Sequence, residues 1–88
     1  MQINKDFTIQ KVGASYVAVP VGETSKHFHG MIRLNETGAF LWNQMVGVDK
    51  TEAELVDALL AEYDVSREIA ERDVHTVVTL LVENKIAL

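Results

Sequence analysis

The sequence has no cysteine and only one proline among its 88 residues. Without cysteine, disulfide bonds, thiolate catalysis and zinc sites held by sulfur are excluded. No apolar run approaches the 18 residues of a membrane-spanning helix, and residues 1–6 lack the apolar core of a signal peptide. We therefore expect a soluble cytoplasmic protein. A chain of this length has room for one core, so residues 1–88 are expected to form a single domain.

Basic side chains are scarce in the second half of the chain. Residues 1–48 carry four basic and three acidic side chains, a balance of +1, whereas residues 49–83 carry three basic and ten acidic ones, a balance of −7. Such an acidic surface repels phosphate backbones, so nucleic acid is not an expected partner. It would suit a basic partner surface or a basic peptide, although a solvated helix exterior explains most of these charges.

The first part of the chain has the pattern of short strands. Residues 7–12 alternate between apolar and polar side chains, with Phe7 and Ile9 on the inner face. Residues 13–15 are predicted as a hairpin connection and residues 16–19 as a second strand. Pro20 has no N–H for a strand ladder, so we place it at the end of that strand or where its nitrogen faces no partner. Residues 21–26 are predicted as a loop.

A third strand is predicted over residues 28–34. One face carries Phe28, Gly30, Ile32 and Leu34, and the other carries His27, His29, Met31 and Arg33. The first set is expected to pack against helices and the second to face outward. If the three strands form a meander, this strand lies at the edge of the sheet, with half of its backbone groups unpaired.

Three helices are predicted after the strands. The first spans residues 35–45, begins at the N-cap Asn35 and presents an apolar face of Leu41, Trp42, Met45 and Val46. The second opens with a capping box at residues 51–54. The third runs from residue 66 to about residue 84, and its apolar arc of about 200° is wider than the ~100° stripe of a helix packed on one side. One flank of this helix therefore has either additional neighbours or a partner that is absent.

These elements predict an α+β fold, a three-stranded antiparallel sheet followed by three helices, similar to a winged helix-turn-helix. That architecture would suit a DNA-binding regulator with the third helix in the major groove. The outward side chains of this helix carry more negative than positive charge, however, where a DNA reader needs arginine and lysine. The fold class is therefore not evidence for DNA binding.

Few residues could carry chemistry. His27 and His29 share a strand face and could begin a metal site, but zinc requires three or four ligands and no third one is close in sequence. His75 has acidic neighbours, yet no nucleophile elbow, phosphate-binding glycine loop or dinucleotide fingerprint is present. We therefore expect no catalysis, no bound metal and no cofactor.

Several motifs together resemble the pyrroloquinoline quinone biosynthesis protein D family (PqqD-like), over nearly the whole chain. The most specific is Leu34-Asn35-Glu36-Thr37-Gly38 followed by Leu41-Trp42. The others are Val19-Pro20-Val21-Gly22, Thr51-Glu52-Ala53-Glu54-Leu55 with Tyr63, and Asp73-Val74 with Leu81. The resemblance implies the fold described above. It also implies a non-catalytic recognition element, or peptide chaperone, for ribosomally synthesised and post-translationally modified peptides (RiPPs). Such proteins bind the leader of a precursor peptide and present it to a modifying enzyme, often a radical S-adenosylmethionine (radical SAM) enzyme.

By this resemblance, the leader would add as a strand beside the third strand and lie against the third helix, a known mode of peptide recognition. The expected site residues are Gly30, Met31, Ile32 and Arg33 on the strand, and Asp73, Thr76, Val77 and Leu80 on the helix. The sequence does not determine which flank of the helix faces the strand. Two other classes stay open: a protein–protein adaptor that holds an enzyme or a second copy of the chain, and a winged-helix transcriptional regulator.

Overall fold

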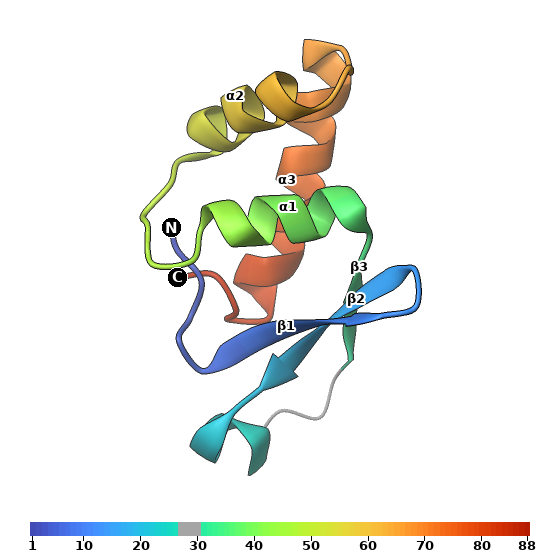
Figure 1. The fold of residues 1–88 in the computed structure, drawn as a ribbon. Helices are drawn as coiled ribbons and strands as arrows, with labels where there is room; N and C mark the ends of the chain where they lie inside the picture. The colour runs from blue at the N-terminus through green and yellow to red at the C-terminus, as the bar shows by residue number, and fades with distance from the viewer. Residues whose placement is uncertain (27–30) are drawn as a thin grey trace.

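The computed structural model describes residues 1–26 and 31–88. In chain order, its elements are β1 (Phe7–Val12), β2 (Ser15–Pro20), the short 3-10 helix η1 (Gly22–Lys26), β3 (Ile32–Leu34), α1 (Glu36–Gln44), α2 (Glu52–Glu62) and α3 (Arg67–Glu83). The strands form an antiparallel sheet in the order β1-β2-β3 (Figure 1). The predicted α+β fold, with three strands followed by three helices, is therefore confirmed. None of the helices in the two described ranges is long and apolar enough to cross a membrane.

The hairpin between β1 and β2 turns on two residues. Gly13 has a φ of 63° and occupies the first turn position, where a type II′ turn requires glycine. Ser15 already belongs to β2, so the turn is one residue shorter than predicted. Pro20 is the last residue of β2, as its missing amide led us to expect.

Two predicted boundaries need correction. Residues 21–26 were expected as a loop, but Gly22–Lys26 forms the helix η1, in which the Ser25 hydroxyl donates to the Gly22 carbonyl at 2.7 Å. Such a short polar helix has no apolar periodicity that the sequence pattern could reveal. Strand three was expected over residues 28–34, but β3 begins at Ile32 and Met31 lies before it. Residues 28–30 lie outside the described residues.

The N-cap predicted at Asn35 and the capping box predicted at residues 51–54 are confirmed. The Asn35 side chain accepts a hydrogen bond from the Gly38 N–H at 2.8 Å, and Ser66 caps α3 in the same way. At the start of α2, the Thr51 N–H donates to the Glu54 carboxylate at 3.0 Å and the Glu54 N–H donates to the Thr51 hydroxyl at 3.1 Å. Because the backbone and the hydroxyl of Thr51 both bond to this carboxylate, they lower the pKa of Glu54.

The core lies between one face of the sheet and the three helices. Leu41, Trp42 and Met45 are each at most 1% exposed, which confirms the inner face predicted for α1. Val46 is 54% exposed, however, so its expected place on that face is wrong. The helix ends at Gln44, and Val46 therefore no longer follows the helical periodicity. Phe40 and Tyr63 pack edge to face, with ring centroids 5.6 Å apart, and join α1 to the end of α2.

The two ends of the chain lie side by side (Figure 1). Gln2 and Leu88 exchange two backbone hydrogen bonds of 2.9 Å, and Ile3 forms an isolated bridge with Ala87. Ile3, Ile86 and Ala87 are buried as a result. The sequence did not predict this closure, because neither end has the alternation of a strand.

Replacing Trp42 with alanine is expected to destabilise the protein by about 3–5 kcal/mol, because a large buried side chain leaves a cavity that the neighbours fill incompletely. This is a large part of the 5–15 kcal/mol that a small domain has. Thermal and denaturant unfolding measure it, with Val46→Ala as the control at an exposed site. Equal unfolding midpoints for the two variants would contradict the packing described here.

Candidate functional site

Strand β3 is an edge strand. Within residues 1–26 and 31–88 it pairs only with β2, in the register Tyr16↔Leu34, Val17↔Arg33 and Ala18↔Ile32. Leu34 is buried and Ile32 half-buried against the core, whereas Arg33 is exposed. The predicted inner and outer faces of this strand are therefore confirmed for the residues that the structure describes.

The hairpin turn determines which backbone groups of β2 reach β3. A two-residue turn makes its flanking residues, Val12 and Ser15, a hydrogen-bonded pair. Bonded and non-bonded pairs alternate along antiparallel strands, so the odd-numbered residues of β2 bond to β1. The bond from the Val21 N–H to the Asp6 carbonyl, 2.8 Å long, continues this series beyond the strand ends. The even-numbered residues of β2 are left to bond β3.

Arg33 consequently presents its backbone to the free edge. Its neighbours Ile32 and Leu34 lie opposite even-numbered residues of β2 and take the hydrogen bonds on that side. The N–H and C=O of Arg33 lie between them and point away from the sheet. An added strand could therefore pair with Arg33 without disturbing the bonds that hold β3 in place.

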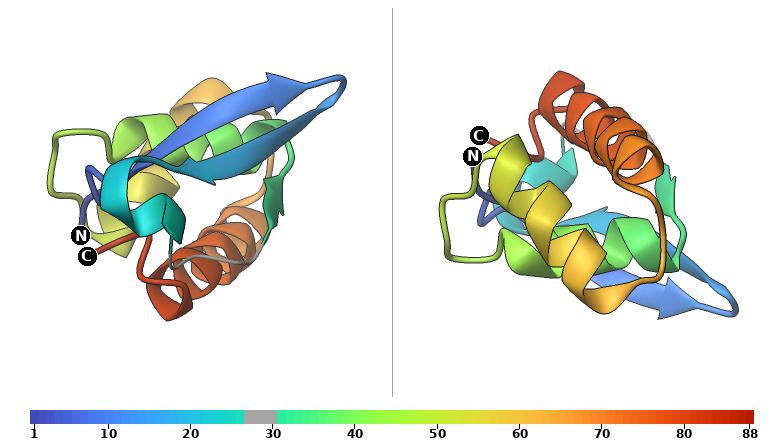
Figure 2. Two further views of the ribbon diagram at one scale, coloured as in Figure 1. Left: turned by 90° about the horizontal axis from the view of Figure 1, so that it is seen from below. Right: turned by 90° about the horizontal axis from the view of Figure 1, so that it is seen from above.

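Helix α3 runs beside this edge (Figure 2). A groove of about 140 Å³ lies between the start of α1 and the middle of α3, and its lining includes Leu41, Asp73, Thr76 and Val77. Three of the four residues predicted on α3 thus line one groove. Leu80 follows Val77 by three residues on the same flank and is also half-buried.

The apolar arc of α3 is covered unevenly by the rest of the protein. On a helical wheel its central stripe is Ala70, Val74, Val77 and Leu81. Val78, on one side of this stripe, is 8% exposed and belongs to the core. On the other side Leu80 is half-buried and Ile69 is 40% exposed, and Val77, in the stripe itself, is also half-buried. The wide apolar arc is thus covered by the core at Val78 but not at Val82, which is 48% exposed, and it meets the groove at Val77.

Only two of the four site residues expected on the third strand belong to β3. Ile32 and Arg33 lie in β3, whereas Met31 precedes it with a side chain that is 66% exposed. Gly30 lies outside the described residues. Sequence reasoning missed three groove residues on and before α1, namely Asn35, Thr37 and Leu41. The spacing of Thr37 and Leu41, which places them on one helix face, is the signal that could have found them.

The charges around the groove are unevenly paired. On α3, Arg67 lies 3.4 Å from Asp57, and the Arg72 Nε lies 3.7 Å from the Asp73 carboxylate. Both arginines of this helix therefore contact acidic groups, which weakens the DNA-binding alternative further. Arg33 forms no ion pair with any residue that the structure describes. Within the same residues, no cluster of histidine and acidic side chains could hold a metal.

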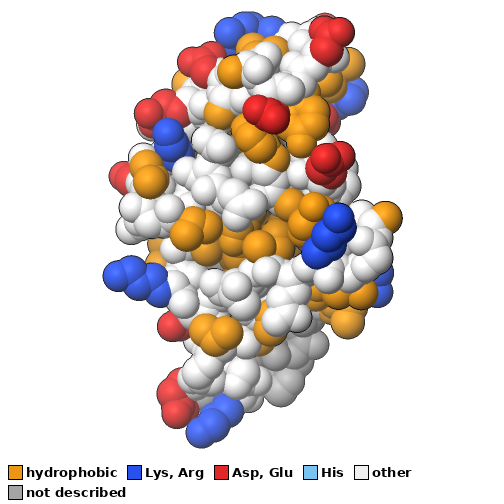
Figure 3. All heavy atoms as spheres, in the orientation of Figure 1, with side chains coloured by type: hydrophobic (Ala, Val, Ile, Leu, Met, Phe, Trp, Pro, Cys, Tyr) orange, Lys and Arg blue, Asp and Glu red, His pale blue; other side chains and the backbone are white. Residues whose placement is uncertain are grey.

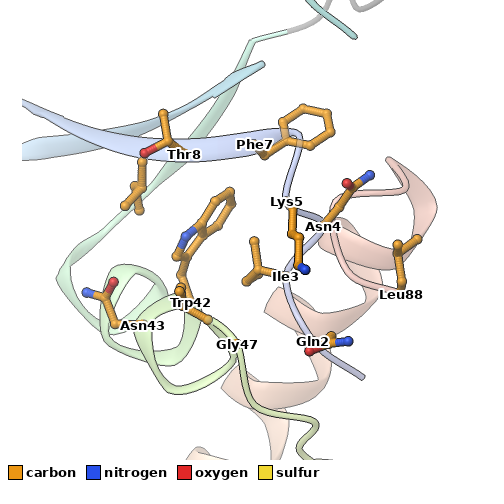
Figure 4. A pocket seen from close by; sticks show the side chains of 12 residues that line it. Gln2, Ile3, Asn4, Lys5, Phe7, Thr8, Trp42, Asn43, Gly47 and Leu88 are labelled. Carbon is orange, nitrogen blue, oxygen red and sulfur yellow. The ribbon is translucent and has the colours of Figure 1, made fainter. Parts of the chain in front are cut away.

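A second and larger hollow of about 610 Å³ lies away from β3. It is bounded by the start of β1, the end of α1 and the joined chain ends (Figure 4). Trp42 forms part of its wall, and the exposed side chains of Lys5, Val46 and Leu88 line it. Apolar side chains gather across the middle of the face shown in Figure 3. No sequence prediction pointed to this hollow.

A free strand edge beside a partly covered apolar helix flank is an arrangement by which proteins bind extended peptides. Residues 16–87 match the family model described as Coenzyme PQQ synthesis protein D (PqqD). The chain therefore belongs to the PqqD family. No curated protein matches it in sequence.

Two solved structures share the fold. One is described as TbiB1 in complex with the TbiA(beta) leader peptide; it is 24% identical, with a TM-score of 0.72 over 99% of this chain and 94% of that one. The other is described as lasso peptide synthetase B1 complexed with the leader peptide; it is 26% identical, with a TM-score of 0.70 over 99% of this chain and 95% of that one.

Hydrogen exchange measured by NMR tests the alternation along β3. The Arg33 amide is expected to exchange about tenfold or more faster than the Ile32 and Leu34 amides, because only these two bond to β2. Slow exchange at the Arg33 amide, with fast exchange at the Ile32 and Leu34 amides, would mean that Ile32 and Leu34 rather than Arg33 present their backbone to the free edge.

Proposed function

We propose that this protein is a non-catalytic recognition element that binds the leader of a ribosomally made precursor peptide. The leader adds as a strand along the free edge of β3 and lies against α3. The observation that carries this proposal is the outward-facing backbone of Arg33 beside the groove lined by Asp73, Thr76 and Val77. Membership of the PqqD family supports it, and so do the leader peptides bound to the two structurally similar proteins.

The energetics permit useful affinity. Each added backbone hydrogen bond contributes about 0.5–1.5 kcal/mol net. A peptide side chain that becomes buried against Val77 and Leu80 adds about 1.5–3 kcal/mol. Four or five hydrogen bonds and one or two such side chains together contribute about 4–13 kcal/mol before the costs of association are subtracted, so micromolar affinity, which needs roughly 8 kcal/mol net, requires contributions near the top of this range.

The proposed site comprises two rows of residues. On the strand side these are Gly30, Met31, Ile32 and Arg33, and on the helix side Asp73, Thr76, Val77 and Leu80. Met31 lies before β3, so it would pair with a peptide only if binding extended the strand towards its N-terminal end. Asn35, Thr37 and Leu41 complete the wall of the groove.

We infer that residues 1–88 act as one domain in the cytoplasm and hand the bound leader to a modifying enzyme. The resemblance to the PqqD family makes a radical SAM enzyme the expected class. The hollow near Trp42 leaves a second surface for that enzyme while the groove is occupied. No cofactor is needed for this role.

An adaptor without a peptide substrate is the second candidate. The exposed Val46 and Leu88 beside the same hollow favour it, because apolar side chains at the rim of a hollow suit a protein partner or a second copy of the chain. Sedimentation of the purified protein separates a homodimer from a monomer. Co-purification with a modifying enzyme encoded next to this protein's gene, in the absence of any precursor peptide, identifies an adaptor.

Binding of the leader encoded beside this protein's gene is expected to depend on the Arg33 amide. Arg33→Pro removes that N–H and places the ring at the edge, while the bonds between β3 and β2 remain. Arg33→Ala is the matched control, because it removes the side chain and keeps the amide. We expect a loss of affinity of tenfold or more for Arg33→Pro relative to Arg33→Ala, measured by calorimetry on variants with native-like NMR spectra.

The same peptide titrated into labelled protein should shift amides of β3 and of the α3 flank that carries Val77. Equal affinities of the proline and alanine variants, with shifts confined to α2 or η1, would contradict the proposed mode of binding.

A further inference from the structure

Two unlike charges stand on opposite sides of the path that an added strand would take. Arg33 projects from the outer face of β3, has an exposed side chain and forms no ion pair with a described residue. Asp73 lines the groove on the inner side, together with Leu41 and Val77. The two side chains are not paired with each other, and the contact of Asp73 with Arg72 is a weak one at the surface.

Asp73 is not satisfied within its own helix. Among the described residues its one ion-pair contact is with Arg72, at 3.7 Å, and the side chain of that arginine is 72% exposed. Such an exposed pair between sequence neighbours is weak. The Asp73 side chain is 44% exposed and stands beside apolar groups. A lysine or arginine could lay its hydrocarbon stem along Leu41 and Val77 and bring its charge to the carboxylate.

Strand geometry assigns these two charges to adjacent positions of the peptide. A residue directly opposite Arg33 in a paired strand places its side chain on the same outer face. Its neighbour in the peptide points to the other face, towards the groove. The groove reaches this part of the edge, because Asn35, which follows β3 directly, shares its lining with Asp73.

We propose, on the basis of the proposed function, that Arg33 and Asp73 select leaders by charge. The recognised segment carries an acidic residue opposite Arg33 and, next to it in sequence, a basic residue that enters the groove at Asp73. The residue on the other side of the acidic one faces Ile32 and the α3 flank, and it is apolar. Arg33 and Asp73 are thus specificity-determining residues, whereas the β3 backbone binds any extended chain.

Selection from a displayed library of random decapeptides tests this assignment. The library is selected against the native protein, Arg33→Glu and Asp73→Lys. Glu71→Lys is the matched control, since it makes the same charge change at an exposed position of α3 outside the groove. The native protein and the control should enrich an adjacent acid–base pair. Arg33→Glu should replace the acid by a base, and Asp73→Lys should replace the base by an acid.

One enriched peptide, synthesised with its acidic residue changed to lysine, should bind the native protein about fivefold more weakly, because like charges then stand opposite each other. It should recover that affinity with Arg33→Glu. NMR shifts of the Arg33 amide report whether each peptide uses the β3 edge. Peptides that shift this amide but show one charge pattern for all four proteins would overturn the charge assignment and leave leader binding intact. If no selected peptide shifts the Arg33 amide, the charge assignment and the proposed leader binding at β3 are both overturned.

Discussion

The alternation of hydrogen bonds across the sheet is the constraint on which the site depends. Gly13 sets a two-residue turn, and this turn fixes which residues of β2 bond to β1 and which to β3. Ile32 and Leu34 are thereby bonded to β2, and the backbone of Arg33 faces outward. A glycine about twenty residues before the edge thus decides which groups a ligand can reach. A shift of one residue in this register would exchange the inner and outer faces of β3.

The junction between β3 and α1 places that edge beside α3. Asn35 caps α1 directly after the strand ends, so the helix begins without a connecting loop. Gly38 fits against Leu34 so closely that an added Cβ would lie 3.1 Å from the Leu34 Cβ. Trp42 and Leu41 then anchor α1 in the core. The groove exists because α3 packs on α1 and α2 while its flank near Val77 stays only partly covered.

The fold could be predicted from the sequence largely because its local signals are strong. Asn35, Thr51 and Ser66 are good N-caps, and the periodicity of α2 and α3 is clear. The site could be predicted only in part. That Val77 rather than Val78 faces the groove depends on how α3 rotates against α1 and α2, which is a tertiary property that a helical wheel does not contain. The chain-end closure through Ile3 and Ala87, and the hollow beside it, depend on contacts between residues more than eighty positions apart.

The most direct test of peptide addition to β3 is an isotope-filtered nuclear Overhauser experiment. The protein is labelled with ¹³C and ¹⁵N, and the leader encoded beside its gene is left unlabelled. Peptide backbone protons are expected to show contacts to the Arg33 amide proton and to the α protons of Ile32 and Leu34, as in an adjacent strand. Peptide side chains should in turn contact Val77. Contacts confined to the hollow around Trp42 and Val46, with none to β3, would contradict strand addition and assign the binding surface to the opposite side of the molecule.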